Sequence, residues 1–481
     1  MLTWPASSTL ARLRPSPPGA AALAFFAAAF LLYAGPALFL LDNYLQPTFD
    51  LGIYDQSLWL IQSGETFNTI LGAHVVGAHF SPILFLLAPV SLVPGGAAPE
   101  IVLQSLLLAS GVFPMTRLAS LLGRRPLWFM VAYTAHPALI GGSWWGFRPW
   151  NLAVPAFAWA VYRIWKRPDV ATAVVAGLAM LAFREDLALW VGLVCLVAAL
   201  AGRMSWADLI VSGLVLASAT AAVLFLIVPV FSPVGAYIYF GQDRPLLSLD
   251  DIVAQAAGRL LFLFAPLGAA PPAIRRRLVA PLAIPIAALI ASGRGTLLFF
   301  HYDMMFVPLL LLIVGVSRRA KLRPALAVIG AALVLTTLGA LRIIHPRYGP
   351  NPLTRDPALT KLVDEVAAAV RAIPGHETAS LAAPTRLLPH FSERRSAFMF
   401  PSPLEMHTNS AASTHHRDEI RYSCPLPDIV VADSSNMTER WPAVLESRYR
   451  LEGEHGRFSV WSAATEQPDA PCSATWREDS P

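Results

Sequence analysis

The chain has 481 residues, of which 55% are hydrophobic and only 14% are charged. Soluble globular domains carry roughly 25% charged residues, so this composition excludes an ordinary soluble protein and predicts an α-helical polytopic membrane protein. The net charge of +5 comes from basic residues between apolar runs, as in cytoplasmic loops. The expected partner is therefore the lipid bilayer and not a nucleic acid.

Apolar runs recur from residue 20 to about 344, many near the roughly 20 residues that cross a bilayer as a helix. The predicted spans are 20–41, 79–94, 100–122, 126–141, 150–165, 170–183, 187–201, 206–231, 252–268, 278–292, 297–316 and 324–344. We expect residues 1–19 to form a cytoplasmic tail and residues 20–344 to form a transmembrane domain of about 11–13 helices.

Basic residues predict the orientation of these spans, because Lys and Arg are enriched in cytoplasmic loops. The basic positions are Arg12, Arg14, Arg124, Arg125, Lys166, Arg167, Arg203, 275–277 and 317–323. Placing them in the cytoplasm puts residues 42–78 and everything after about 345 outside a multi-pass protein of the plasma membrane. This topology needs an odd number of spans, so the short, proline-rich run 79–94 is either re-entrant or a miscounted span.

The first external loop, 42–78, contains Thr48-Phe-Asp-Leu-Gly-Ile-Tyr-Asp-Gln56, and Gly77-Ala-His-Phe-Ser-Pro82 follows it. Asp50 and Asp55 are candidate catalytic bases for a hydroxyl acceptor. With His79 they are also candidate ligands of a divalent metal such as Mg or Mn. In the structural alternative Asp50 caps an interfacial helix, Asp55 is solvated and His79 is a hydrogen-bonded interfacial group. Five positions correspond to about 140° around a helix, so both carboxylates face one cavity only if the helix starts irregularly.

Three further segments carry charged or aromatic candidates on the predicted external side. The turn Phe183-Arg-Glu-Asp-Leu187 is either a solvent-exposed hairpin or a polar site in which Arg184, beside Glu185 and Asp186, binds phosphate. The segment Trp144–Asn151 is either an interfacial tryptophan belt or a surface that stacks a sugar or lipid head group beside Arg148. The pair His301 and Tyr302 admits the same two interpretations.

After about residue 345 the composition becomes polar, which predicts a small extracytoplasmic α/β domain over 345–470 and a tail over 471–481. Helices are expected at 357–373, 384–391 and 437–446, and strands at Thr378–Ala382, Asp428–Ala432 and Phe458–Trp461. Cys424 and Cys472 form either a disulfide in this domain or two separate thiols.

The motifs together resemble a family of bacterial and archaeal membrane proteins known mainly as a domain of unknown function. Its FDxGxxDQ and GxHFSP-like segments match Phe49–Gln56 and His79–Pro82, and the resemblance covers roughly residues 20–465. Phe183–Asp186 resembles the basic-Glu-Asp turn of the family, and His301-Tyr302 resembles its His-Tyr pair. The chain departs from the pattern at Phe147-Arg-Pro149, where a Phe-His-Pro type of segment is expected.

The layout of this family is similar to that of the GT-C glycosyltransferases. The resemblance implies a transferase that takes a sugar from a polyprenyl-phosphate carrier to an acceptor at the external membrane face. By that analogy Asp50 or Asp55 is the base or metal ligand, and Arg184, Arg148 or His79 stabilises the departing lipid phosphate. The alternative is a non-enzymatic membrane protein that binds or transports lipid or glycan. The sequence leaves the sugar, the acceptor and the oligomeric state open.

Overall fold

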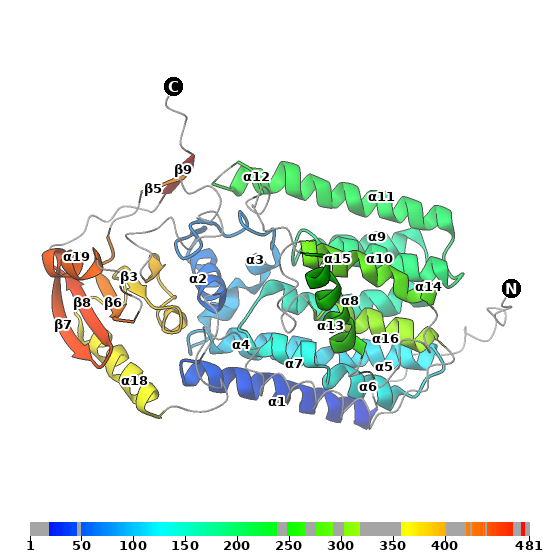
Figure 1. The fold of residues 1–481 in the computed structure, drawn as a ribbon, viewed down its shortest axis with the longest axis horizontal. Coiled ribbons are helices and arrows are strands. Elements are labelled where there is room, and N and C mark those ends of the chain that lie inside the picture. The colour runs from blue at the N-terminus through cyan, green and yellow to red at the C-terminus, as the bar shows by residue number, and fades with distance from the viewer. Residues whose placement is uncertain are drawn as a thin grey trace.

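A mostly helical body and a small C-terminal sheet domain make up the chain, and helices α2 (Asp50–Gln62) and α3 (Ile83–Leu87) lie between them in the view of Figure 1. The computed structural model describes residues 19–45, 50–233, 235–237, 248–264, 267, 276–291, 303–317, 357–400, 420–423, 426–435, 437, 440–464 and 473–476.

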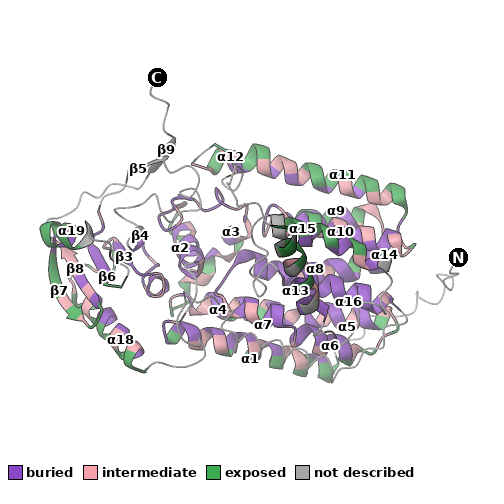
Figure 2. Cartoon of the chain, in the orientation of Figure 1, coloured by how far each residue is buried: buried purple, intermediate pink, exposed green. Residues whose placement is uncertain are grey.

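Three helical segments of the described chain are long and apolar enough to cross a membrane. They are α1 (Ala20–Asp42), the pair α4 (Ala98–Ser110) and α5 (Val112–Leu121), and the run α11 (Trp206–Ala222), η3 (Val223–Ile227) and α12 (Val228–Phe231). Much of the last run is exposed (Figure 2), including Leu214 at 64% and Phe225 at 63%. Exposed apolar side chains on a long helix are what a lipid-facing surface requires.

The other apolar helices are shorter, and several begin at a proline, which fits the first turn of a helix because its missing N–H has no partner there. They are α6 (Pro126–Thr134), α7 (Pro137–Trp144), α8 (Pro149–Lys166), α9 (Val170–Leu181), α10 (Leu187–Leu200), α13 (Leu249–Phe264), α14 (Arg276–Val279), η6 (Ala280–Leu282), α15 (Ala283–Ala291) and α16 (Phe306–Val316). The predicted run 126–141 is thus two helices that meet at His136-Pro137. The predicted span 324–344 lies outside the described residues.

The prediction of a membrane span at 79–94 is wrong as a continuous helix. The segment folds as two five-residue pieces, α3 and the 3-10 helix η2 (Ala88–Leu92). Ten helical residues reach about 15 Å, roughly half the hydrocarbon thickness of a bilayer. Pro89, near the start of η2, accounts for the change in helix type, because its ring cannot continue the α-helical hydrogen bonding.

The C-terminal domain contains a five-stranded mixed sheet in the order β4-β3-β6-β8-β7. Strands β3 (Leu381–Ala383), β4 (Ala397–Met399) and β6 (Ile429–Asp433) run parallel, and β8 (Phe458–Ala463) pairs antiparallel with β6 and with β7 (Tyr449–His455). Helices α18 (Pro357–Ala372) and α19 (Arg440–Arg448) belong to this domain. A separate pair is formed by β5 (Ile420–Ser423) and β9 (Ser473–Trp476).

Side chains that alternate along β6 contribute to two separate hydrophobic clusters, one on each face of the sheet. Ile429 and Val431 join the large core that contains residues of α18, whereas Val430 and Ala432 pack in a second cluster with Leu445 of α19. Successive side chains of a strand point to opposite faces, so each face receives its own set. The strand predictions at 378–382, 428–432 and 458–461 and the helix predictions at 357–373 and 437–446 are confirmed to within a few residues. Within 384–391 the structure instead has a single 3-10 turn, η8 (Leu388–His390).

The first loop is attached to the C-terminal domain by hydrogen bonds between segments more than 300 residues apart. Thr69 Oγ1 donates to the carbonyl of Ala397 at 2.6 Å and accepts from its N–H at 2.9 Å. The amide of Gln56 donates to the carbonyl of Arg394 at 3.2 Å and to Thr69 at 2.8 Å. These contacts fix α2, and therefore Asp50 at its first residue, relative to the C-terminal domain.

Candidate functional site

An ion pair joins the start of α2 to the start of α8. Arg148 Nε donates to Asp50 Oδ2 at 3.0 Å, and the Nη2 group of the same guanidinium contacts the same oxygen. The Arg148 side chain is 1% exposed, while that of Asp50 is 27% exposed. A buried cation therefore faces a carboxylate that solutes can reach. Both contacts go to Oδ2, so Oδ1 is not engaged by Arg148.

The backbone of Arg148 is held by Gln104 of α4. The Arg148 N–H donates to Gln104 Oε1 at 2.9 Å, and the Asn151 side-chain amide donates to the same oxygen at 3.0 Å. Gln104 in turn donates to the carbonyl of Gly146 at 3.1 Å. Gly146 has φ +82°, a conformation that favours glycine. These bonds turn the chain sharply before α8 and fix the position of Arg148.

The indole of Trp150 is the centre of the site. The guanidinium carbon of Arg184 lies 5.2 Å from the ring centroid and that of Arg148 lies 5.7 Å away. The rings of His79 and Tyr54 meet Trp150 edge-on, at 5.7 Å and 5.9 Å between centroids. Arginine above an aromatic ring is attracted to its negative face, so Trp150 holds both cations close together.

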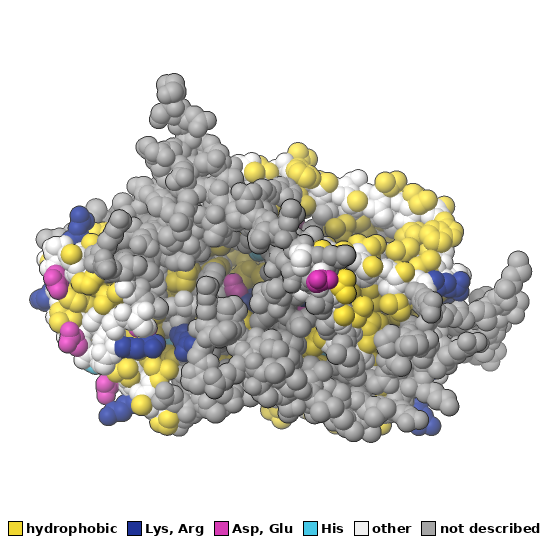
Figure 3. All heavy atoms as spheres, in the orientation of Figure 1, with side chains coloured by type: hydrophobic (Ala, Val, Ile, Leu, Met, Phe, Trp, Pro, Cys, Tyr) yellow, Lys and Arg dark blue, Asp and Glu magenta, His cyan; other side chains and the backbone are white. Residues whose placement is uncertain are grey.

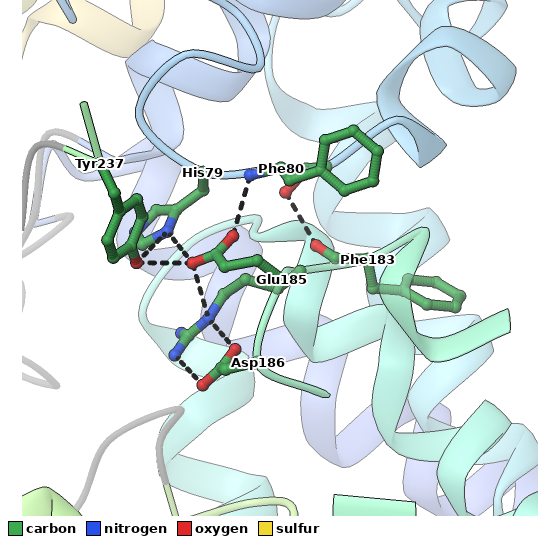
Figure 4. A network of polar contacts seen from close by, with 8 residues as sticks. His79, Phe80, Phe183, Glu185, Asp186 and Tyr237 are labelled. Carbon is green, nitrogen blue, oxygen red and sulfur yellow. Dashed lines mark hydrogen bonds and ion pairs between the residues drawn. The ribbon is translucent and has the colours of Figure 1, made fainter. Parts of the chain in front are cut away.

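Glu185 organises the histidine side of the site (Figure 4). Its Oε1 contacts His79 Nδ1 at 2.8 Å and accepts from the Tyr237 hydroxyl at 2.6 Å, while its Oε2 accepts from the backbone N–H of Phe80 at 2.9 Å. Burial alone would raise the pKa of Glu185, but His79, Arg184 and the Tyr237 hydroxyl outweigh it and lower that pKa to about 2. Glu185 is therefore an ionised, fully enclosed anchor for His79.

Arg184 is held by its neighbour in the turn before α10. Its Nε and Nη2 donate to the two oxygens of Asp186, each at 2.6 Å, in a bidentate pair. The Arg184 side chain is 8% exposed and that of Asp186 is 39% exposed. This pair repeats the arrangement of Arg148 and Asp50, with an enclosed cation and an accessible carboxylate.

Three helix N-termini converge at these residues, because α2 begins at Asp50, α8 at Pro149 and α10 at Leu187. Free N–H groups and the helix dipole make each N-terminus favourable for anions. Figure 3 shows acidic and basic side chains in a hollow between the C-terminal domain and the helical body. Two arginines and three helix N-termini at one place make a site suited to phosphate.

The structure does not bring Asp55 into this site. Asp55 is 0% exposed and accepts a hydrogen bond from the Ser392 hydroxyl of the C-terminal domain. Because α2 is regular from its first residue, the two carboxylates point in different directions, and the irregular start that would let them share a cavity is not present. The expectation that Asp55 is solvated is wrong as well.

The predicted metal ligands likewise have separate partners: Asp50 binds Arg148, Asp55 binds Ser392 and His79 binds Glu185. Among the residues that the structure describes, no group of three or more His, Cys, Asp and Glu side chains is placed to hold a metal ion. Asp50, Asp55 and His79 therefore do not fit a common Mg or Mn centre.

Arg148, Arg184, Glu185, Asp186, His79 and Asp50 are brought together, whereas His301, Tyr302, Cys424 and Cys472 lie outside the described residues. The sequence analysis missed Tyr237 and Gln104 as members of the site. Tyr237 lies between two apolar runs with Tyr239 two positions later, which gave no signal of a contact with Glu185. Gln104 is a polar residue inside an apolar run, which is a signal of a buried polar contact.

Comparison with known families places the chain among membrane proteins. The family model described as "Predicted membrane protein (DUF2079)" matches residues 41–467, which includes the first loop, the helical body apart from nearly all of α1, and most of the C-terminal domain. No curated protein matches the chain. Because the family model covers most of its length, the chain belongs to this family of predicted membrane proteins of unknown function.

Proposed function

We propose that the protein is an integral-membrane glycosyltransferase that takes a sugar from a polyprenyl-phosphate donor and transfers it to an acceptor at the external face of the plasma membrane. The proposal includes a GT-C-like, multi-pass body of about 11–13 spans and an extracytoplasmic C-terminal domain. Its main support is the Asp50–Arg148 ion pair beside Trp150 and Arg184, where an accessible carboxylate adjoins two enclosed cations.

The two arginines are suited to the phosphate of the donor. A guanidinium group binds phosphate oxygens through two parallel N–H donors, and this charge-assisted contact strengthens as the leaving phosphate gains charge. Exchange of Asp50 and Asp186 for phosphate oxygens would keep Arg148 and Arg184 in their present positions on Trp150. The apolar surfaces of the long helices are suited to the polyprenyl chain.

Asp50 is suited to act as the base once phosphate occupies Arg148. The acceptor hydroxyl attacks the anomeric carbon and forms a new C–O bond while the bond from that carbon to the phosphate oxygen breaks. The phosphate leaves with the electron pair, and the hydroxyl proton passes to the Asp50 carboxylate. Glu185 keeps the His79 ring oriented against Trp150 at the edge of this centre.

Turnover of a radiolabelled polyprenyl-phosphate hexose in proteoliposomes tests the proposal. Asp50→Asn and Arg148→Gln should each reduce release of polyprenyl phosphate at least about 100-fold, because each removes a charge that acts in the transition state. Arg167→Gln is the matched control, since Arg167 is exposed beyond the opposite end of α8, and it should leave turnover unchanged. Equal turnover by wild-type protein and Asp50→Asn would contradict Asp50 as base, and donor binding without any turnover would favour a lipid-binding protein.

A further inference from the structure

Two buried carboxyl groups, one on α2 and one on α4, are not part of the site around Trp150. Asp55 of α2 and Glu100 of α4 are both 0% exposed. Asp55 Oδ2 accepts from Ser392 Oγ, while Asp55 Oδ1 and both Glu100 carboxylate oxygens have no hydrogen-bond partner in the described part of the chain. Three buried acidic oxygens without donors would be costly if both groups were ionised.

The surroundings of Asp55 supply no compensating positive charge among the described residues. Burial, followed by the charge of Glu100, raises the pKa of Asp55 well above its ordinary value, and the Ser392 hydrogen bond lowers it only in part. Glu393 is a third acidic group that acts on Asp55. The helix α3 and the 3-10 helix η2 that pack on α2 contribute no charged residue.

The nearby basic groups are directed elsewhere. Arg394 donates to the carbonyls of Phe391, His376 and Ala379 at 2.6–3.0 Å. Arg395 pairs with Glu65 at 3.3 Å on the surface. Burial lowers the pKa of His390, on η8, to about 4, so that this ring is neutral at physiological pH.

We propose that Asp55 and Glu100 form a buried proton-binding site. At least one of the two carboxyl groups is protonated while the C-terminal domain is docked, and its deprotonation releases the segment 391–399 from α2. A protonated carboxyl group is neutral, so protonation removes the cost of enclosing a charge whose oxygens have no donor in the described part of the chain. Ser392 carries the effect to the segment, because its hydroxyl bonds directly to Asp55.

The position of Asp55 in α2 supports this role. Gly52 and Gln56, one turn apart, also face the C-terminal domain: a Cβ at Gly52 would lie 3.3 Å from Leu388 Cγ, and Gln56 bonds to Arg394. One side of α2 between Gly52 and Gln56 therefore docks the C-terminal domain, while Asp50 belongs to the site around Trp150. The proton-binding site does not depend on the proposed transferase activity.

Hydrogen exchange of the full-length protein in nanodiscs between pH 6 and pH 9 tests the proposal, after correction for the intrinsic pH dependence of exchange. In the wild type, the opening constant of residues 391–399 should rise with pH between the ordinary pKa of the released carboxyl group and its raised pKa in the docked protein, by up to about tenfold per pH unit for one coupled proton, and should level off above the raised pKa. Asp55→Asn mimics the protonated group, and it should keep these amides protected with no such rise. Glu100→Gln should also reduce the rise, and serves as a second variant if Asp55→Asn does not fold.

Glu65→Gln is the control, because it removes a surface carboxylate at the same junction and should retain the wild-type pH dependence. Ser392→Ala should weaken protection at every pH without abolishing the rise. An unchanged rise in both Asp55→Asn and Glu100→Gln would overturn the proposal. Protection that returns at pH 9 on adding Na⁺ or K⁺ at constant ionic strength would also overturn it, in favour of a metal cation.

Discussion

Arg148 binds the carboxylate of Asp50 although 98 positions separate the two residues in the chain. The contact joins the start of the first-loop helix to the start of α8, and Trp150 places a second cation, Arg184, against the same ring system. A buried arginine that already holds a carboxylate oxygen is well suited to exchange it for a phosphate oxygen, because both are negatively charged acceptors for its N–H groups.

Substitutions of Arg148 should separate charge from geometry. Arg148→Lys keeps a positive charge but loses the planar fork and the stacking on Trp150, so we expect the donor KM to rise about tenfold. Arg148→Gln loses the charge as well, and it should raise the donor KM further, by roughly 100-fold in total. Steady-state kinetics with varied polyprenyl-phosphate sugar measure both effects. Identical KM values for wild type and Arg148→Gln would show that this residue does not bind the donor.

The lowered pKa of Glu185 predicts that the folded protein loses stability in acid. Its pKa is about 2 in the folded protein and 4.5 ordinarily, so the unfolded chain takes up a proton at a higher pH than the folded protein does. The stability that Glu185 contributes is therefore fully present above about pH 4.5 and is lost as pH falls toward 2.

Glu185→Gln should lower the free energy of unfolding by about 3 kcal/mol near neutral pH, since it breaks a buried charged network. The free energy of unfolding of this variant should also depend less on pH in acid than that of the wild type. Thermal unfolding in detergent at several pH values measures this, with Glu65→Gln on the surface as the control. An acid dependence of the same size in Glu185→Gln and wild type would rule out this contribution.

Thr69 should be important for docking the C-terminal domain. Thr69→Val removes a hydroxyl that both donates to and accepts from the backbone of Ala397, and it leaves buried backbone groups without a partner. We expect a loss of about 1–3 kcal/mol in stability and faster hydrogen exchange at residues 397–399. Thr116→Val is the control, because that hydroxyl bonds only to the carbonyl one turn earlier in its own helix. Exchange at 397–399 that does not change in Thr69→Val would contradict the docking role.

Gly77 should tolerate no side chain. A Cβ at this position would lie 2.3 Å from the backbone oxygen of Phe231, at the end of α12, so Gly77→Ala forces the first loop and α12 apart. A displacement of this kind costs typically about 1–3 kcal/mol. Gly35→Ala in α1 is the control, since no atom lies within 4 Å of its added Cβ. The melting temperature of Gly77→Ala should fall, whereas that of Gly35→Ala should not. An equal fall in both variants would refute the close approach of Gly77 to Phe231.

The sequence predicted the structure well where the chemistry of a residue limits the secondary structure and burial that it can have. Apolar periodicity and β-branched runs located most helices and three strands, because burial requires those patterns whatever the neighbours are. The predictions at 79–94 and 384–391 failed because hydrophobicity alone does not distinguish a span from short turns packed on α2 and the C-terminal domain.

The sequence predicted which residues belong to the site better than it predicted which of them contact each other. Charged residues beside apolar runs identified Asp50, Arg148 and Arg184 as candidates, since ionisable groups there are costly unless they have a partner. The partners themselves could not be predicted, because Asp50 meets Arg148 and Asp55 meets Ser392 through tertiary packing over 98 and 337 positions. The sequence offered Asp50 and Asp55 as alternative bases, and their different surroundings in the structure now distinguish them.

The most direct measurement is a structure of the protein in a nanodisc with polyprenyl monophosphate. The proposed function predicts phosphate density within hydrogen-bond distance of the Arg148 and Arg184 guanidinium groups, beside the Trp150 ring, with the Asp50 carboxylate displaced from Arg148. Phosphate bound elsewhere, with the Asp50–Arg148 ion pair intact, would contradict the account.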